Sequence, residues 1–442
     1  MPASCLKMFC HQCSMSAPGG CGSTGAPFGN CGKSATLSRL QDTMIFGLKG
    51  LSAYRTHLND LNPEATKEVD DVIAQTLYFT LTNVNFNFDD HIAQLMKIGR
   101  AGTRVMHLLG EAHHAKLGVP TPVTVPQNKA EGKAILITGH DLGLLKDLLE
   151  ATKDKGINIY THSEMLPAHG YPELRKYKHL KGNIGKAWFD QRILFKKWSG
   201  SILVNTNCIV PPTPNCGYLD RLFTHSIVGV EGATKIEGND FSELIEKTLA
   251  LPDVTGFETD ETLQTGHNHK TILTMAPQIL EAIGSGKIKN FFVVAGCDAP
   301  GKGGDYYRKL TQALPKDVVI LTSSCGKFRF NDLDFGMIPG TEIPRYLDLG
   351  QCNDSYGAVE IALALSTALD TPVKDLPISI ILSWMEQKAV IILLALFSLD
   401  IKNIHLGPCP PQFMNEDIVN FLSDTFGFSL TTTVEEDLKK LL

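Results

Sequence analysis

The apolar residues in the first part of the chain recur with a helical period. Between Thr36 and His114, leucine, isoleucine, valine and methionine return at steps of three and four residues, as on one face of an α-helix. Asn62-Pro63-Glu64 supplies a helix start within this region, because proline is well tolerated at the first helical position. The spacing predicts helices with short connections, arranged as a three-helix bundle.

The pattern changes after a proline-rich linker at residues 117–132. Short apolar and β-branched runs then alternate with helical segments, which is typical of βαβ units in a parallel sheet. The predicted strands cover residues 134–138, 157–161, 201–207, 223–230, 318–321, 346–349, 378–382 and 403–406, with a further strand leading to Cys297. Helices are predicted at 272–283 and, fully buried, at 389–399.

These elements predict a multi-domain α plus α/β protein. A cysteine-rich loop and the three-helix bundle take residues 1–120, and two Rossmann-like parallel-sheet α/β domains take residues 121–270 and 271–442. In such sheets, ligands bind beyond the carboxyl ends of the strands. We therefore expect the residues that bind ligands to lie in the turns after the strands.

Composition narrows the classes of function. Of the 442 residues, 43% are hydrophobic and 20% are charged, and the net charge is −6, so the chain has no basic footprint for nucleic acid. The most apolar run, 389–399, is too short to span a bilayer. The N-terminus lacks the apolar region of a secretory signal. We therefore expect a cytoplasmic protein with neither a nucleic-acid nor a membrane partner.

The chain contains 11 cysteines, an odd number that argues against a disulfide framework and favours reduced thiols that bind metal. Cys10 and Cys13 form a tight pair, and Cys21 and Cys31 follow among glycines. One tight pair with irregular partners is typical of iron–sulfur clusters, whereas zinc ribbons usually carry two tight pairs. An iron–sulfur cluster is the favoured interpretation, and a zinc site or free thiols are the alternatives.

A second set of metal-capable side chains shares one position, the turn that follows a β-strand. Its members are His140, Glu164, Cys208, Cys297, Cys325, Cys352 and Glu386. Parallel strands place their carboxyl ends on one edge, so these side chains can converge if the two sheets meet edge to edge. Taken singly, each has a structural explanation, such as a helix cap or a buried ion pair. Together, thiolates with imidazole and carboxylates predict a polynuclear iron centre with soft and hard ends.

The sequence around these residues resembles the hybrid cluster protein family, also called the prismane or hydroxylamine reductase family. The matching strings include Gly-His-Asp-Leu at His140, Thr-His-Ser-Glu-Met-Leu-Pro-Ala-His-Gly at Glu164, Cys-Gly-Lys-Phe-Arg-Phe-Asn at Cys325, Gly-Gln-Cys-Asn-Asp at Cys352 and Ser-Trp-Met-Glu-Gln-Lys at Glu386. The likeness covers residues 8–442 and fits the short class of the family, which has a single N-terminal bundle.

This resemblance implies two cofactors. A hybrid 4Fe–2O–2S cluster is held by the seven residues named above, with Cys297 at the position that carries a persulfide and Lys388 lining the same site. A 4Fe–4S cluster, with 2Fe–2S as the alternative, is held by Cys10, Cys13, Cys21 and Cys31. The remaining Cys5, Cys216 and Cys409 match no ligand and are interpreted as structural.

The activity that the resemblance implies is the reduction of hydroxylamine to ammonia and water, with electrons from an electron-donor protein. Glu164, Cys297, Glu386 and Lys388 are the candidate catalytic residues. Three other functions remain open: nitric oxide reduction, a persulfide-based S-nitrosylating or redox-sensing role, and carbon monoxide dehydrogenation at a nickel–iron centre, which related folds house.

Overall fold

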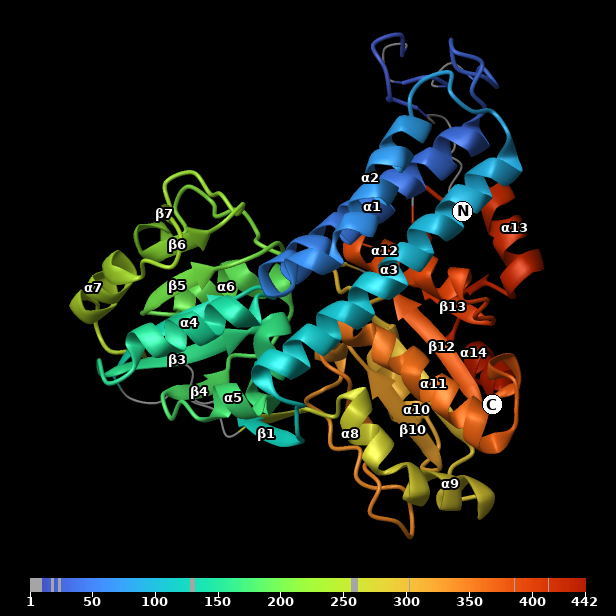
Figure 1. Cartoon of the computed structure of the whole chain (residues 1–442). Coiled ribbons are helices and arrows are strands. Elements are labelled where there is room, and N and C mark those ends of the chain that lie inside the picture. Colours follow the sequence, from blue (N-terminus) through green and yellow to red (C-terminus); the bar gives the residue numbers. More distant parts are fainter. Residues whose placement is uncertain are drawn as a thin grey trace. The chain divides into compact units, whose positions relative to one another are not determined.

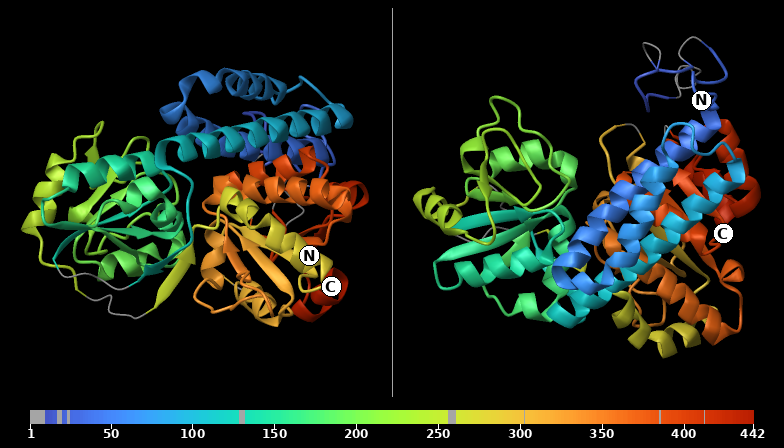
Figure 2. Two further views of the ribbon diagram at one scale, coloured as in Figure 1. Left: turned by 60° about the horizontal axis from the view of Figure 1, so that its bottom comes forward. Right: turned by 45° about the horizontal axis from the view of Figure 1, so that its top comes forward.

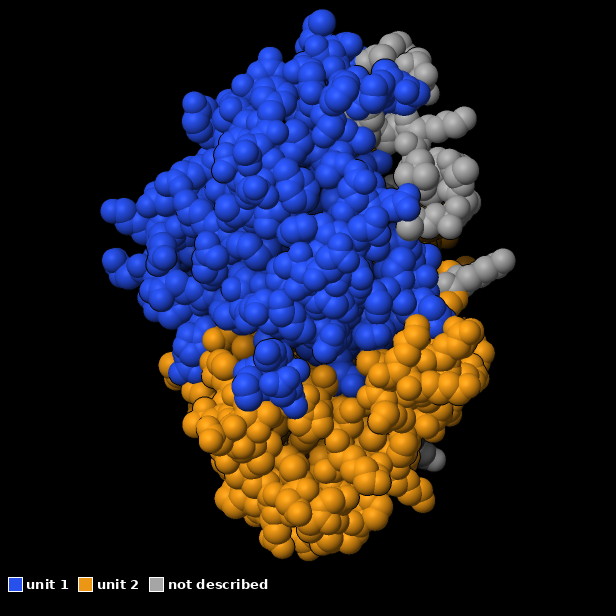
Figure 3. All heavy atoms as spheres, turned by 90° about the vertical axis from the view of Figure 1, so that its right-hand side faces the viewer, with its two compact units in different colours: residues 1–112, 372–375, 379–432 blue, residues 113–371, 376–378, 433–442 orange. Residues whose placement is uncertain are grey.

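The computed structural model describes residues 10–16, 20–22, 25–127, 132–255, 261–301, 303–384, 386–411 and 413–442 (Figures 1 and 2). Cys5 lies outside these residues. The chain groups into two compact units, coloured separately in Figure 3: unit 1 comprises residues 1–112, 372–375 and 379–432, and unit 2 comprises residues 113–371, 376–378 and 433–442. The domain boundaries predicted at residues 120 and 270 stay a prediction.

Unit 1 contains the predicted helical bundle. Helices α1 (Ala35–Leu61), α2 (Lys67–Phe79) and α3 (Phe88–Leu117), whose last turn belongs to unit 2, run side by side in Figure 2 and confirm the bundle. Ser34 caps α1 by accepting a hydrogen bond from the Leu37 backbone nitrogen at 3.3 Å, as a serine before a helix should. No helix among the described residues is both long and apolar enough to cross a bilayer.

The later elements of unit 1 surround the buried helix α12 (Gln387–Ser398), which the sequence predicts. They are β12 (Ile378–Ser383, of which Ile378 belongs to unit 2), β13 (Ile404–Gly407), α13 (Glu416–Phe426) and β14 (Ser429–Leu430). The three strands are parallel, with β13 between the other two. Predicted strands 378–382 and 403–406 are therefore confirmed.

Helix α12 packs closely against α1 and α3 because glycines face it. A Cβ atom on Gly50 would lie 2.4 Å from the Gln387 carbonyl oxygen, and one on Gly99 would lie 2.2 Å from the Leu394 carbonyl oxygen. No real side chain tolerates such distances to backbone, so the bundle glycines set how near α12 can approach. The residue that directly precedes α12, Glu386, is one of the predicted iron ligands.

Gly99→Ala is expected to destabilise the protein by about 1–3 kcal/mol, because the new methyl group overpacks a backbone contact that has no room to relax. Gly110→Ala, on the same helix, is the matched control. Nothing lies within 4 Å of a Cβ at Gly110, so alanine should stabilise the helix by about 0.5–1 kcal/mol. Urea unfolding of the two variants measures both effects, and equal midpoints would contradict the packing argument.

Unit 2 contains a six-stranded parallel sheet in the order β4-β3-β2-β5-β6-β7. Its strands are β2 (Lys133–Thr138), β3 (Ile157–His162), β4 (Leu180–Asn183), β5 (Ser201–Val204), β6 (Leu222–His225) and β7 (Thr234–Ile236). The central strand β2 is buried on both faces. Ile135 and Ile137 pack with leucines of α4 (Leu142–Thr152), while Ala134 and Leu136 pack on the other side with Trp198. This is the predicted Rossmann-like arrangement.

A second group of parallel strands in unit 2 has the order β11-β10-β9, with β9 at Asn290–Gly296, β10 at Val318–Thr322 and β11 at Tyr346–Asp348. The remaining helices of the unit are α5 (Pro172–Arg175), α6 (Gln191–Lys197), α7 (Ser242–Ala250), α8 (His269–Thr274), α9 (Ala276–Gly284), α10 (Asp305–Ala313), α11 (Tyr356–Leu369) and α14 (Val434–Leu441). The fold class predicted from the sequence is therefore confirmed.

Three local predictions are wrong. The segment 117–132 contains a strand, β1 (Val123–Pro126), that pairs antiparallel with β8 (Thr262–Thr265), because prolines at its ends do not remove its inner hydrogen bonds. The helix predicted at 272–283 is two helices, since Pro277 cannot continue α8 and instead starts α9. Predicted strands 201–207 and 223–230 end earlier, at Val204 and His225.

Candidate metal centres

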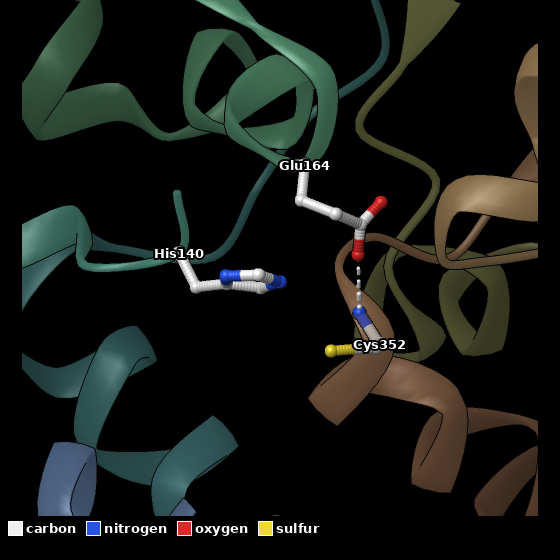
Figure 4. Close-up of side chains that lie close together, drawn as sticks. All are labelled: His140, Glu164 and Cys352. Atoms are coloured by element: carbon white, nitrogen blue, oxygen red, sulfur yellow. Dashed lines mark hydrogen bonds between the residues drawn. The ribbon is translucent and has the colours of Figure 1, made fainter. Parts of the chain in front are cut away.

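Three of the predicted ligands come together in unit 2. One nitrogen of His140, one carboxylate oxygen of Glu164 and the sulfur of Cys352 all lie within 4.8 Å of one another (Figure 4). All three residues are buried, with exposed fractions of 6%, 2% and 8%. His140 follows β2, Glu164 follows β3 and Cys352 follows β11, so strand ends from both parallel sheets of this unit meet here. The structure thus brings these three predicted ligands together, and their role as ligands stays a prediction.

His140 is positioned by the turn after β2. Gly139 has φ +131°, and a Cβ there would lie 1.9 Å from Asn205 Oδ1, so only glycine fits. That amide oxygen accepts a hydrogen bond from the His140 backbone nitrogen at 3.1 Å. The Thr206 hydroxyl lies 2.8 Å from His140 Nδ1, which fixes the ring and leaves Nε2 available to a metal.

Glu164 lies in the short helix η3 (Ser163–Gly170), which begins directly after β3. Its Oε2 accepts a hydrogen bond from the Cys352 backbone nitrogen at 2.8 Å, the dashed line of Figure 4. Gln351 joins the two sides of the site, because its Nε2 donates to the Glu164 carbonyl oxygen at 2.8 Å and to the His140 carbonyl oxygen at 3.1 Å. Sequence reasoning missed Gln351, although its place directly before Cys352 was a usable signal.

The thiol of Cys325 belongs to the same neighbourhood. Its sulfur lies 3.7 Å from the Ser163 hydroxyl. Burial raises the pKa of Cys325 well above its ordinary value, and the negative charges of Glu164, Cys208 and Cys297 raise it further. A buried thiolate beside other anionic groups is unfavourable without a cation, and a bound metal deprotonates coordinating thiols outright. The donor set therefore fits a polynuclear iron–sulfur centre.

A buried ion pair lies behind the ligands. Lys327 and Asp348 are both 0% exposed, and Lys327 Nζ donates to the two carboxylate oxygens at 2.9 and 3.1 Å and to the Gly350 carbonyl oxygen at 2.8 Å. Burial lowers the pKa of Lys327, but the charges of Asp348 and Glu164 outweigh burial and leave it raised. The short helix η6 (Cys325–Arg329) thus holds a buried lysine, paired with Asp348, two residues after Cys325.

Two histidines of the motif around Glu164 are buried and neutral. His162 Nδ1 lies 2.8 Å from the Thr138 hydroxyl, and His169 Nε2 lies 2.9 Å from the Thr161 hydroxyl. Burial lowers the pKa of His162 to about 3 and that of His169 to about 4. Because these rings do not charge in the folded protein, they can serve as fixed hydrogen-bonding groups beside the site.

Stability is therefore expected to fall as the pH falls from about 6.5 to 4. In that window the unfolded chain binds a proton on each histidine and the folded protein does not, and each group contributes about 1.4 kcal/mol per pH unit. His169→Gln removes one of these two groups, so it should reduce the dependence of stability on pH by the contribution of one proton. Urea unfolding midpoints at several pH values between 7 and 5 measure this dependence. His107→Gln, on an exposed position of α3, is the control, and equal slopes in the two variants would contradict the prediction.

The cysteine-rich loop in unit 1 places Cys10 beside Cys21 and the sulfurs of Cys21 and Cys31 around one glycine. The Cys21 backbone nitrogen donates to the Cys10 carbonyl oxygen at 2.8 Å. A Cβ added to Gly29 would lie 3.5 Å from Cys21 Sγ and 3.8 Å from Cys31 Sγ, so both sulfurs border the space that this glycine leaves open. The Gln12 backbone nitrogen lies 3.5 Å from Cys10 Sγ, which is the kind of contact that supports a cluster ligand. These residues fit an iron–sulfur cluster.

All ten cysteines among the described residues are thiols, and none forms a disulfide. Cys13, the second member of the tight pair, accepts a backbone hydrogen bond from Ser16 at 3.2 Å through its carbonyl oxygen. Cys216 is buried in the core near Trp198, and Cys409 is exposed. The assignment of individual cysteines as ligands stays a prediction.

The last two predicted site residues, Glu386 and Lys388, belong to unit 1. Glu386 is exposed and precedes α12. Lys388 is buried, and its Nζ lies 5.3 Å from the centre of the Tyr54 ring. Their assignment to the centre formed by His140 and Cys352 stays a prediction from the sequence.

Comparisons with known proteins agree with this architecture. The family model described as "Prismane/CO dehydrogenase family" matches residues 8–93 and 65–439. The chain is 46% identical over 438 residues to a hydroxylamine reductase of Thermotoga petrophila, covering 99% of this chain and 100% of that relative. It is 46% identical over 401 residues to one of Geobacter metallireducens, covering 91% of this chain and 72% of that relative. The chain thus matches the length of the shorter relatives.

Solved structures with the same fold are more distant in sequence. Carbon monoxide dehydrogenase from Thermococcus sp. AM4 superposes with a TM-score of 0.79 at 17% identity, covering 99% of this chain and 90% of that one. Carbon monoxide dehydrogenase IV from Carboxydothermus hydrogenoformans gives 0.77 at 16%, covering 99% and 92%. These two establish the fold alone. With its family model matched along nearly its whole length, the chain belongs to the Prismane/CO dehydrogenase family.

Proposed function

We propose that this protein is an iron–sulfur oxidoreductase that reduces hydroxylamine to ammonia and water. One observation carries the proposal. The imidazole of His140, the carboxylate of Glu164 and the thiol of Cys352 are buried, and their ligand atoms lie within 4.8 Å of one another. Pure thiolate sites favour electron transfer, whereas mixed nitrogen, oxygen and sulfur donors leave iron able to bind a small polar substrate. The relatives named hydroxylamine reductase, 46% identical along the full chain, support this substrate.

The reaction adds two electrons and two protons to hydroxylamine, breaks its N–O bond, and releases ammonia and water. A mixed-ligand iron–sulfur centre supplies Lewis-acid positions and electrons when it is bound. The chain contributes a site with buried ligands, which excludes bulk water and strengthens every charge–charge interaction. It also contributes side chains that can hold protons, and Glu164, Cys297, Glu386 and Lys388 are our candidates for catalytic groups.

We assign the ligands of the hybrid centre as His140, Glu164, Cys208, Cys297, Cys325 and Cys352, with Glu386 as a seventh and Lys388 lining the centre on the basis of the sequence. Cys10, Cys13, Cys21 and Cys31 are assigned to a second cluster, 4Fe–4S with 2Fe–2S as the alternative. When both clusters are bound, the second one would accept electrons from an electron-donor protein and would supply them to the hybrid centre.

Protein purified without oxygen tests the proposal. Iron and sulfide counts with Mössbauer and EPR spectra should reveal two distinct iron–sulfur centres. With reduced methyl viologen as donor, hydroxylamine should yield one ammonia for every two electrons consumed. Parallel assays with nitric oxide and with carbon monoxide distinguish hydroxylamine reduction from nitric oxide reduction and from carbon monoxide dehydrogenation. A higher kcat/KM for nitric oxide than for hydroxylamine, or nickel with carbon monoxide oxidation, would refute the proposal.

A further inference from the structure

A lysine is buried at the base of the cysteine-rich loop. Lys33, two residues after Cys31, is only 2% exposed. Its Nζ donates to Gln12 Oε1 at 2.8 Å and to Gln41 Oε1 at 2.6 Å. Gln12 lies between Cys10 and Cys13 in the loop, and Gln41 lies on α1, so the ammonium group joins the loop to the bundle.

The hydrogen bonds beyond Gln41 have a fixed direction. His91 Nδ1 lies 2.7 Å from the Asn87 carbonyl oxygen, which only accepts, so Nδ1 carries the hydrogen. His91 Nε2 lies 3.2 Å from Gln41 Nε2, an amide group that only donates, so Nε2 accepts. The Gln41 amide therefore turns its oxygen toward Lys33. In this arrangement His91 is neutral, and the positive charge is on Lys33.

One carboxylate takes part in the network, but it does not touch the ammonium group in any of these contacts. Asp42 Oδ1 accepts from Gln12 Nε2 at 2.7 Å, so the Gln12 amide separates Asp42 from Lys33. Gln12 Nε2 also lies 3.3 Å from the Ser38 carbonyl oxygen. A buried ammonium that is held by neutral amides is costly unless an anion lies nearby. Asp42, one amide away, is one such anion, and the proposed cluster with its four thiolate ligands is a second.

Lys33 and the loop are linked through Gln12. The backbone nitrogen of Gln12 lies 3.5 Å from Cys10 Sγ, while its side chain accepts from Lys33. Two hydrogen bonds, one at each end of Gln12, thus link the buried ammonium group to a proposed ligand sulfur, although Gln12 itself is partly exposed. Net charge, hydrogen bonds to sulfur and solvent exposure are the features that set the reduction potentials of iron–sulfur clusters.

We propose that Lys33 is the residue that sets the reduction potential of the cluster at Cys10, Cys13, Cys21 and Cys31. Reduction adds one electron to an already anionic cluster, and the fixed positive charge favours that step more strongly in a buried site than in water. The inference rests on the proposed assignment of these four cysteines. Lys33 acts as a positioning and electrostatic residue and does not touch substrate.

The test is an anaerobic, EPR-monitored redox titration of the full-length protein after its iron content has been measured. Lys33→Met should shift the midpoint potential of the second cluster to a more negative value, and Lys33→Arg, which keeps the charge, should stay near wild type. Lys97→Met, which removes a lysine that bonds Gln75 at 2.5 Å between α2 and α3, is the control and should cause no shift.

Asp42→Asn provides a second variant in case Lys33→Met loses the cluster. Removing this carboxylate leaves the charge of Lys33 uncompensated, so the potential should shift in the positive direction. Unchanged potentials in iron-loaded Lys33→Met and Asp42→Asn would overturn the proposal. Equal shifts in Lys33→Met and Lys33→Arg would overturn it too, because geometry and not charge would then be responsible. If Cys13→Ser keeps full iron and an unaltered EPR signal, the ligand assignment itself fails, a result independent of hydroxylamine turnover.

Discussion

Glu164→Gln is expected to reduce hydroxylamine turnover at least about 100-fold. Replacing groups that merely orient a metal ligand already costs about 10–100-fold in affinity or activity, and Glu164 is assigned as a ligand itself. Glutamine keeps the shape and an oxygen that can accept from the Cys352 nitrogen, so the fold should persist. The loss then reports the missing negative charge. Steady-state ammonia production and the iron count of the purified variant measure it.

Glu173→Gln is the matched control for this variant. Glu173 lies in the same stretch of chain, and its carboxylate pairs with Lys176 at 2.5 Å on the surface. Exposed pairs of this kind contribute about 0–1 kcal/mol, so turnover and iron content should match the wild type. Wild-type turnover in Glu164→Gln would show that Glu164 is not a ligand of the centre. A comparable loss of turnover in Glu173→Gln would indicate a general effect of removing a negative charge.

Lys327→Met is expected to destabilise the protein by about 3–5 kcal/mol. Methionine fills a similar volume but leaves the Asp348 carboxylate buried without its cation, which is the costly way to break a buried pair. The Thr265 hydroxyl donates to Asp348 Oδ2 at 2.8 Å and remains, but a hydroxyl does not neutralise the charge. Urea unfolding under anaerobic conditions gives the change in free energy.

The comparison for this variant is Lys289→Met, which breaks the exposed pair with Asp317 at 2.8 Å. Its expected effect is below about 1 kcal/mol, because water screens the charges. A double variant, Lys327→Met with Asp348→Leu, should recover part of the loss, since it removes both buried charges together. A small effect of Lys327→Met alone, equal to that of the exposed pair, would contradict the argument that breaking the buried pair leaves a costly uncompensated charge.

The sequence was sufficient to predict elements whose patterns are local. The helical period before the proline-rich segment and the alternation of strands, turns and helices after it depend on neighbouring residues. Both patterns were predicted correctly. The shared position of His140, Glu164 and Cys352 after strands follows from a general rule for parallel sheets. What failed was a pairing between distant segments, β1 with β8, and a helix break at Pro277.

The residues that support the site could not be predicted in the same way. Gln351 matters because its amide reaches the carbonyl oxygens of His140 and Glu164, which come from another sheet. Lys327 pairs with Asp348, which lies 21 positions later in the sequence. Lys33 donates a hydrogen bond to Gln12, which lies at the opposite end of a glycine-rich loop. Apart from the place of Gln351 directly before Cys352, nothing in the local pattern distinguishes these polar side chains from solvated ones. Their partners are defined only by the folded arrangement of unit 1 or unit 2.

The small ribbon of β1 and β8 has a consequence for the history of this chain. Val123 pairs with Thr265 and Pro126 with Thr262, so the polypeptide enters and leaves the first parallel sheet at neighbouring points. A segment with adjacent ends can be exchanged or enlarged as a cassette, because the scaffold on either side keeps its course. His140, Glu164 and Cys208 lie inside this cassette, whereas Cys325 and Cys352 lie beyond it. Replacing one insert could thus give the same thiols a new set of hard ligands, and with them a different chemistry.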